Sequence, residues 1–229
     1  CKLYLKPECL QKTGSFKLRG SGYKIAMLSE EEKARGVIAC SAGNHAQGVA
    51  LAASKCGISS LICLPDTAPI SKVEATKGYG AQVCLVPGVY DDAYNRALEL
   101  KEERGYTFVQ PFDDEYVISG QGTIGLEIMN EMSDVDAVIV PIGGGGLISG
   151  VACAIKSISP HVKVYGVQAA GAPSMFNAVN HGHMEALEKV STIADGIAVK
   201  KPGEITYEMV KNYVDDIALV TEDEIAAAI

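Results

Sequence analysis

The sequence predicts an α/β fold with two parallel sheets. Short apolar runs alternate with longer stretches of helical periodicity, which is the order of parallel β-α-β units. The alternation forms two series, separated by the turn-rich stretch 109–115. A chain of 229 residues, 48% of them hydrophobic, can build one large domain or two smaller ones around a substantial core.

The first series begins with a predicted strand at residues 2–5 and a helix at 15–28. Ser29 and Glu32 then form a capping box, which predicts a short helix that ends at Arg35. The following strands are predicted at 37–39, 60–64 and 82–86. The helices after these strands are expected at 44–55, 70–79 and 90–104.

The second series repeats this rhythm, but one of its segments, 169–190, has no consistent period and receives no predicted element. Strands are predicted at 137–140, 163–167 and 217–220, and helices at 116–132, 147–157 and 204–213. Thr221 and Glu224 form another capping box, for a helix that runs to Ile229. Because predicted elements begin and end at the chain ends, we expect a fragment that is truncated at both ends.

Composition narrows the choice of partners and compartment. The 20 basic residues are scattered and outnumbered by 28 acidic ones, so we expect no nucleic-acid partner. The most apolar stretch, 138–155, contains Pro141 and four glycines, which favours a strand, turn and helix over a membrane span. Seven cysteines without a C-x-x-C pair, and no signal peptide, predict a cytoplasmic protein.

Lys17 is the first candidate for chemistry. It follows Phe16 at the start of a predicted helix, and other cations, Lys12 and Arg19, are near in sequence. A lysine in a partly desolvated pocket near other cations loses its proton more readily and can form a Schiff base with an aldehyde. The alternative is an ordinary lysine on a solvated helix face.

Four consecutive glycines, Gly143 to Gly146, are followed by Leu147 between a predicted strand and helix. Consecutive backbone N–H groups at a helix N-terminus can surround an anion, so this loop predicts a phosphate site. The alternative is a flexible turn. Ile148 and Ser149 interrupt the dinucleotide pattern G-x-G-x-x-G, and no P-loop pattern occurs.

A second turn, Cys40-Ser41-Ala42-Gly43-Asn44-His45, also follows a strand and opens a helix. Its N–H groups, with the Ser41 hydroxyl and the Asn44 amide, predict a carboxylate site. Alternatively Ser41 or Asn44 is a simple N-cap, and His45 is favoured as a structural histidine. Gly196 follows Asp195 in a segment that either places a backbone carbonyl near a ligand or is a plain turn. His181 and His183 are too isolated to indicate a metal, so no metal site is predicted.

These segments together resemble the fold-type II pyridoxal-phosphate enzymes, the tryptophan synthase β-like type. Within them the chain is most similar to the threonine dehydratase (threonine ammonia-lyase) and serine racemase family. The similarity runs in order along nearly the whole chain. It is carried by residues 7–17, 41–45, 119–127, 143–147 and 192–196.

The resemblance implies a pyridoxal 5'-phosphate cofactor joined to Lys17 as a Schiff base. It also implies that Phe16 packs on the cofactor ring and Asn44 bonds the ring hydroxyl. The other implied cofactor-binding residues are Gly143, Gly144, Gly145, Gly146 and Leu147 at the phosphate, and Gly196. The substrate carboxylate would be bound by Ser41, Gly43, Asn44 and His45.

The same resemblance implies a small mobile domain at residues 36–113 and a large cofactor-binding domain at 1–35 and 114–229. The expected reaction is dehydration and deamination of L-threonine, and of L-serine, to a 2-oxo acid and ammonia. The expected partner is thus a small amino-acid substrate, and the full-length protein is expected to be a homo-oligomer.

Two departures narrow the family expectation. Ala42 stands where the racemases have a serine that exchanges a proton, so racemisation is disfavoured. Gln168 stands where that branch has an acidic metal ligand, which argues against a divalent cation. Serine racemase, and a ligand sensor without catalysis, stay as alternatives, the latter because the family's later segment that bonds the pyridine nitrogen would lie beyond Ile229.

Overall fold

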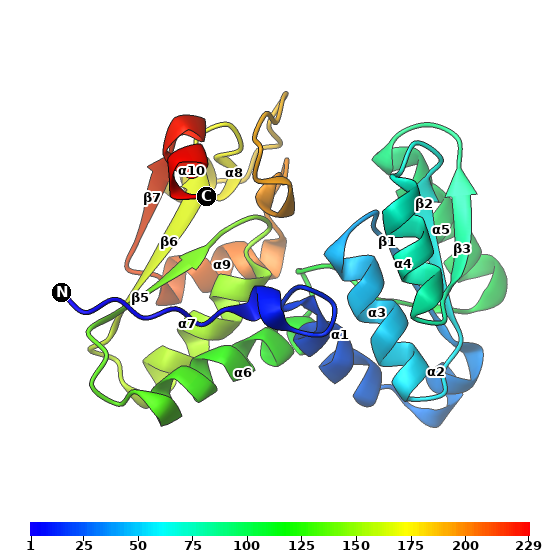
Figure 1. Cartoon of the computed structure of the whole chain (residues 1–229), viewed down its shortest axis with the longest axis horizontal. Coiled ribbons are helices and arrows are strands. Elements are labelled where there is room, and N and C mark those ends of the chain that lie inside the picture. The colour runs from blue at the N-terminus through cyan, green and yellow to red at the C-terminus, as the bar shows by residue number, and fades with distance from the viewer. The chain divides into compact units, whose positions relative to one another are not determined.

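The computed structural model describes residues 1–229, which form two compact units, 1–111 and 112–229. Each unit has its own parallel sheet, as predicted, and Figure 1 labels all helices from α1 to α10 and all strands except β4. No helix is both long and apolar enough to cross a membrane. The assignment of 1–35 and 114–229 to one domain, and of 36–113 to another, stays a prediction.

The first unit contains a four-stranded sheet with the strand order β3-β2-β1-β4. All three pairings are parallel. The strands are β1 Val37–Cys40, β2 Ser60–Pro65, β3 Gln82–Val86 and β4 Thr107–Phe108. The helices are α1 Lys17–Ala26, α2 Glu30–Arg35, α3 Asn44–Lys55, α4 Ile70–Gly78 and α5 Tyr90–Arg104, after a 3-10 turn η1 at Glu8–Leu10.

Helices cover both faces of this sheet. Right-handed crossovers from β1 to β2 and from β2 to β3 place α3 and α4 on one face, and the return to β4 places α5 on the other. Side chains of β1, β2 and α5 form one buried cluster, which includes Ile38, Cys63 and Leu100. Because β1 and β2 are buried along their whole length, they read as continuous apolar runs in the sequence.

Helices α1 and α3 approach closely at Gly48. A Cβ at this position would lie 3.0 Å from Ser21 Oγ and 3.1 Å from the Lys17 carbonyl group. The glycine therefore lets the backbone that carries Lys17 rest directly on α3.

The second unit contains a three-stranded parallel sheet with the order β5-β6-β7. Its strands are β5 Ala137–Pro141, β6 Lys163–Ala169 and β7 Asp216–Val220. Its helices are α6 Glu115–Glu131, α7 Gly146–Ile158, α8 Ser174–His181, α9 Glu204–Tyr213 and α10 Glu222–Ala228, with a 3-10 turn η2 at Asp195–Ile197. The crossovers place α7, α8 and α9 on the same face of the sheet.

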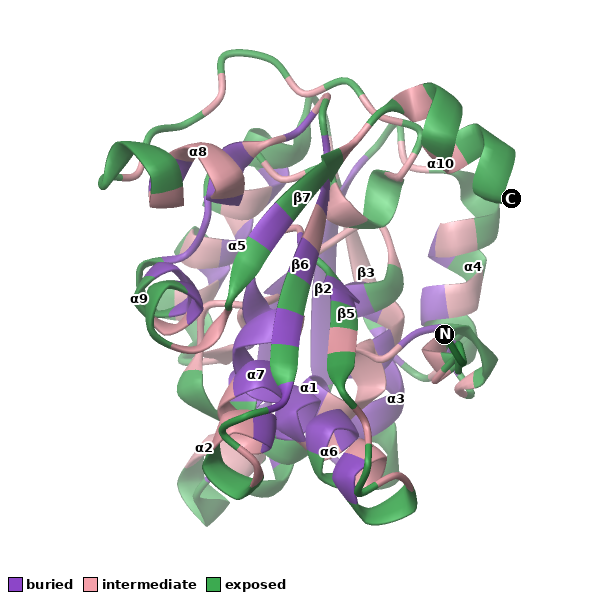
Figure 2. Cartoon of the chain, turned by 90° about the vertical axis from the view of Figure 1, so that its left-hand side faces the viewer, coloured by how far each residue is buried: buried purple, intermediate pink, exposed green.

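The two faces of this sheet differ in burial, and Figure 2 shows buried and exposed residues alternating along β6. Val164 and Gln168 are buried, whereas Tyr165 is 37% and Ile139 63% exposed. Helices α6 and α7 pack closely against each other at Gly150 of α7. A Cβ at this position would meet the carbonyl oxygen of Ile118 in α6.

Three details differ from the sequence prediction. Residues 2–5 form no strand, because no neighbouring strand pairs with them, and Leu3 and Leu5 are about four-fifths exposed, at 80% and 83%. Strand β4 was not predicted because it has two residues, too few for a period. Helix α8 was not predicted because it spans two turns and buries only Ser174, Met175 and Ala178.

Candidate active site

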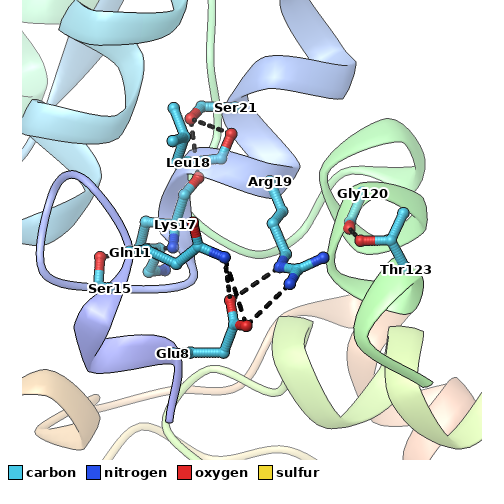
Figure 3. A network of polar contacts seen from close by, with 9 residues as sticks. All are labelled: Glu8, Gln11, Ser15, Lys17, Leu18, Arg19, Ser21, Gly120 and Thr123. Carbon is cyan, nitrogen blue, oxygen red and sulfur yellow. Dashed lines mark hydrogen bonds and ion pairs between the residues drawn. The ribbon is translucent and has the colours of Figure 1, made fainter. Parts of the chain in front are cut away.

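Lys17 is the first residue of α1, and its amine is directed to the backbone rather than to solvent. Its Nζ donates a hydrogen bond of 2.6 Å to the Pro111 carbonyl oxygen and lies 5.4 Å from the centre of the Phe16 ring. The Ser15 hydroxyl accepts a 3.4 Å hydrogen bond from the Lys17 N–H. Figure 3 shows Lys17 at the start of α1 and Ser15 in the loop before it.

Burial lowers the pKa of Lys17 from 10.5 to about 8. At neutral pH this shift increases the fraction of free amine by about 300-fold. A free amine is the form that attacks an aldehyde or accepts a proton from carbon. Neighbouring cations were also expected to lower the pKa of Lys17, but desolvation alone causes the shift.

Arg19, one of those cations, is paired with a carboxylate. Its Nε and one terminal nitrogen each donate a 2.8 Å hydrogen bond to Glu8, as Figure 3 shows. Gln11 donates to the same carboxylate at 3.3 Å. This bidentate pair joins η1 to the first turn of α1, so it helps to fix the turn that carries Lys17.

The turn 41–45 leaves the first N–H groups of α3 available. The N-cap residue is Gly43, which has no side chain to bond them. The Ser41 hydroxyl accepts from the Gly43 N–H at 3.1 Å, and Asn44 is exposed at the first position of the helix. Neither Ser41 nor Asn44 is thus a simple N-cap, and the turn can receive an anion.

The His45 ring is buried below this turn. Its Nε2 lies 2.8 Å from the Val109 carbonyl oxygen, so Nε2 carries the proton and donates. Burial, and then the charge of Lys17, lowers the pKa of His45 to about 3, which keeps the ring neutral. A part for His45 in substrate binding would therefore fall to its backbone N–H, while the ring is bonded as a structural histidine is.

The two carbonyl groups that hold Lys17 and His45 were not found from the sequence. Val109 and Pro111 belong to the segment that follows β4, and they act through backbone oxygens. Backbone groups are the same in every residue, so no residue type could signal them. The predicted turn at Pro111 was the nearest indication.

The tetraglycine loop lies between β5 and α7 in the second unit, and side chains of the same unit pack tightly against its backbone. A Cβ at Gly144 would lie 2.5 Å from the Phe112 ring, and one at Gly146 2.8 Å from Phe112 Cβ. Gly145 has a φ of +95° and would meet Met175 at 2.6 Å. The glycines are thus required by close packing and are not a flexible turn.

This loop fits a phosphate group. Gly145 is the N-cap of α7, so the first N–H groups of the helix, up to Leu147, have no side-chain cap. Gly196, predicted to present a carbonyl near a ligand, lies beside the loop. Its oxygen is 3.5 Å from the position of a Cβ at Gly143.

The two residues that depart from the family pattern, Ala42 and Gln168, are both uncharged. Ala42 is half-buried and has no group that can exchange a proton. Gln168 is fully buried, and its Oε1 accepts a 2.9 Å hydrogen bond from the Phe176 N–H. Its Nε2 has no partner.

The chain combines parallel sheets with a desolvated lysine at a helix start and a tetraglycine loop before another helix. This combination is typical of enzymes that use a phosphorylated aldehyde. The family described as pyridoxal-phosphate dependent enzyme matches residues 1–229, so the chain belongs to this family. This membership confirms the predicted fold class and the cofactor, pyridoxal phosphate.

Individual relatives are close. The chain is 58% identical over 228 residues to an L-threonine ammonia-lyase of Thermotoga maritima, covering 100% of this chain and 57% of that relative. It is 46% identical to the solved processed form of threonine deaminase isoform 2 from Solanum lycopersicum, with a TM-score of 0.97 over 99% of this chain and 66% of that one. Maize serine racemase follows with 39% identity and a TM-score of 0.93 over 96% of this chain and 67% of that one.

Proposed function

We propose that the protein containing this chain is an L-threonine ammonia-lyase, also called threonine dehydratase, with L-serine as a second substrate. The products are a 2-oxo acid and ammonia. The observation that carries the proposal is the Lys17 amine, which burial holds at a pKa of about 8 inside the segment that the relatives share. The relative that is 58% identical bears this activity in its name.

Each candidate residue has a part in this proposal. Lys17 binds the cofactor covalently, Phe16 packs on its ring and Asn44 bonds the ring hydroxyl. Gly143, Gly144, Gly145, Gly146 and Leu147 bind the phosphate through N–H groups, beside Gly196. The Ser41 hydroxyl and the N–H groups of Gly43, Asn44 and His45 bind the substrate carboxylate. When bound, the cofactor supplies a conjugated ring that spreads the negative charge left on the substrate α-carbon.

Lys17 then acts as the base. Its free amine takes the proton from the α-carbon, and the carbon–oxygen bond at the β-carbon breaks. The leaving hydroxyl takes up one proton, equivalent to the one that Lys17 removed, and departs as water. Water then hydrolyses the released enamine to the 2-oxo acid and ammonia. A base with a pKa near 8 is about one-tenth deprotonated at pH 7, yet strong enough to accept the proton. The carbonyl of Pro111, 2.6 Å from Nζ, holds the amine while it is not bonded to the cofactor.

The decisive experiment is an assay of 2-oxobutanoate release from L-threonine by the full-length protein, with and without added pyridoxal phosphate. We expect cofactor-dependent release. Failure of the loaded protein to release the product from L-threonine or L-serine would reject the proposal. Borohydride reduction followed by peptide mapping should label Lys17, and no label would favour a sensor without the covalent cofactor.

Serine racemase is the second candidate, since the maize enzyme has a similar fold at 39% identity. Ala42 supports elimination over racemisation, because its methyl group cannot exchange a proton on the other face of the α-carbon. Substantial D-serine formation from L-serine by the full-length protein would overturn this preference.

The remaining expectations concern the whole protein. A net charge of −8 supports a small-molecule partner rather than nucleic acid or a membrane surface. We also propose a cytoplasmic homo-oligomer, which size-exclusion chromatography of the full-length protein would test.

A further inference from the structure

The Gly144 carbonyl group is held by a buried threonine that none of the sequence motifs included. Thr206, in the first turn of α9, donates a 2.6 Å hydrogen bond from Oγ1 to the Gly144 oxygen. Thr206 is 0% exposed, so water does not compete for this bond. Its Cβ would be 2.8 Å from a Cβ at Gly145, which shows how closely the two segments pack.

This bond determines where the next N–H points. In a trans peptide the C=O of Gly144 and the N–H of Gly145 are directed to opposite sides. Because the carbonyl faces Thr206, the Gly145 N–H faces away from α9. The φ of +95° at Gly145 then leads the chain into α7, whose first N–H groups carry no side-chain cap.

Thr206 is itself held in place from outside its helix. The carboxylate of Asp113 accepts hydrogen bonds from the backbone N–H groups of Glu204, Ile205 and Thr206, at 3.0, 3.0 and 3.2 Å. A carboxylate at a helix N-terminus is favourable for both the N–H groups and the helix dipole. Asp113 follows Phe112, whose ring and backbone pack against Gly144 and Gly146. The short segment 112–113 therefore contacts both the tetraglycine loop and the first turn of α9.

We propose that Thr206 is a positioning residue for the cofactor phosphate, which aims the Gly145 N–H at the phosphate by fixing the Gly144 carbonyl. Asp113 supports it by holding the first turn of α9. This inference rests on the proposed function, since it assumes that the loop binds the phosphate of pyridoxal phosphate.

The test compares pyridoxal phosphate with pyridoxal, which lacks the phosphate. Thr206→Val keeps the shape of the side chain but removes the 2.6 Å hydrogen bond to the buried Gly144 oxygen, which then keeps only the 3.5 Å bond from the Gly203 N–H. Thr206→Ser keeps the hydroxyl. Dissociation constants are measured by absorbance titration of the full-length protein after removal of its cofactor. We expect Thr206→Val to raise the dissociation constant of pyridoxal phosphate roughly tenfold and to leave that of pyridoxal unchanged. Thr206→Ser should bind pyridoxal phosphate nearly as tightly as the wild type.

Thr76→Val is the matched control. Thr76 is 1% exposed and donates a 2.8 Å hydrogen bond to the Lys72 carbonyl within α4, in the first unit. Its replacement should leave the ratio of the two dissociation constants unchanged. If Thr206→Val does not fold, Asp113→Asn provides the second variant, with a smaller loss that is still confined to pyridoxal phosphate.

The outcomes separate the inference from the proposed function. Equal weakening of both ligands, or no weakening, would show that Thr206 is only structural and would overturn the inference alone. If the wild-type protein does not prefer pyridoxal phosphate over pyridoxal, the proposed phosphate site fails as well.

Discussion

The Lys17 turn and the tetraglycine loop begin helices in different units, and their proposed roles depend on opposite properties. At Lys17 one side chain carries the proposed function, and burial changes its pKa. In the loop, side chains are absent, and Phe112, Met175 and Thr206 fill the space where they would be. The first region should therefore respond to changes in chemistry, and the second to changes in volume.

The largest effect should come from Lys17→Ala. Loss of the amine would remove both the proposed covalent attachment point and the proposed base, so turnover should fall by roughly a thousandfold or more. The measurements are 2-oxobutanoate release and borohydride labelling in the full-length protein. Lys12→Ala, which replaces an exposed lysine nearby, should keep both. Elimination at the wild-type rate without Lys17 would refute its role.

Gly144→Ala should break the loop by volume alone. The added methyl group would lie 2.5 Å from the Phe112 ring, so the loop must shift. We expect weaker binding of pyridoxal phosphate and a free energy of unfolding lower by about 1–3 kcal/mol. Combining it with Phe112→Ala removes the clash and should restore part of the binding. If Gly144→Ala alone binds as the wild type does, packing does not define the cradle.

Gly48→Ala tests whether volume also matters on the lysine side. The new Cβ would press on the Lys17 backbone at 3.1 Å, so relief requires the start of α1 to move. A severalfold fall in kcat is expected, because a small displacement of a catalytic group is costly. Gly22→Ala is the control on α1 itself, since nothing lies within 4 Å of its Cβ. That variant should gain up to about 1 kcal/mol of stability without a change in kcat.

The variant with the smallest effect at neutral pH is His45→Gln, whose effect lies in the pH dependence of stability. The pKa of His45 in the folded state is about 3, against an ordinary 6.5, so the unfolded chain binds more protons between these values. The contribution of His45 to stability is therefore complete above about 6.5 and is lost as the pH falls towards 3. His45→Gln keeps an N–H donor for Val109 but cannot titrate. Unfolding free energies of the two proteins should diverge on acidification, and parallel curves would contradict the buried neutral ring.

Much of the fold could be predicted from the sequence where an element is long and has a clear period. Helices α3, α5 and α9 have the predicted bounds, because amphipathic repeats over ten or more residues mark both ends. Strand 2–5 was wrong since an apolar alternation cannot reveal whether a partner strand exists. Strand β4 and α8 were too short for a period to develop.

The sequence alone determined the residue types of the candidate site, because a lysine after an aromatic ring and four adjacent glycines are visible as letters. Only the tertiary structure decided their properties. The pKa of Lys17 depends on how much water its surroundings exclude, and the need for glycine at 144 depends on Phe112, 32 positions earlier. Desolvation and steric exclusion are produced by atoms distant in the chain, so folding is required before either exists.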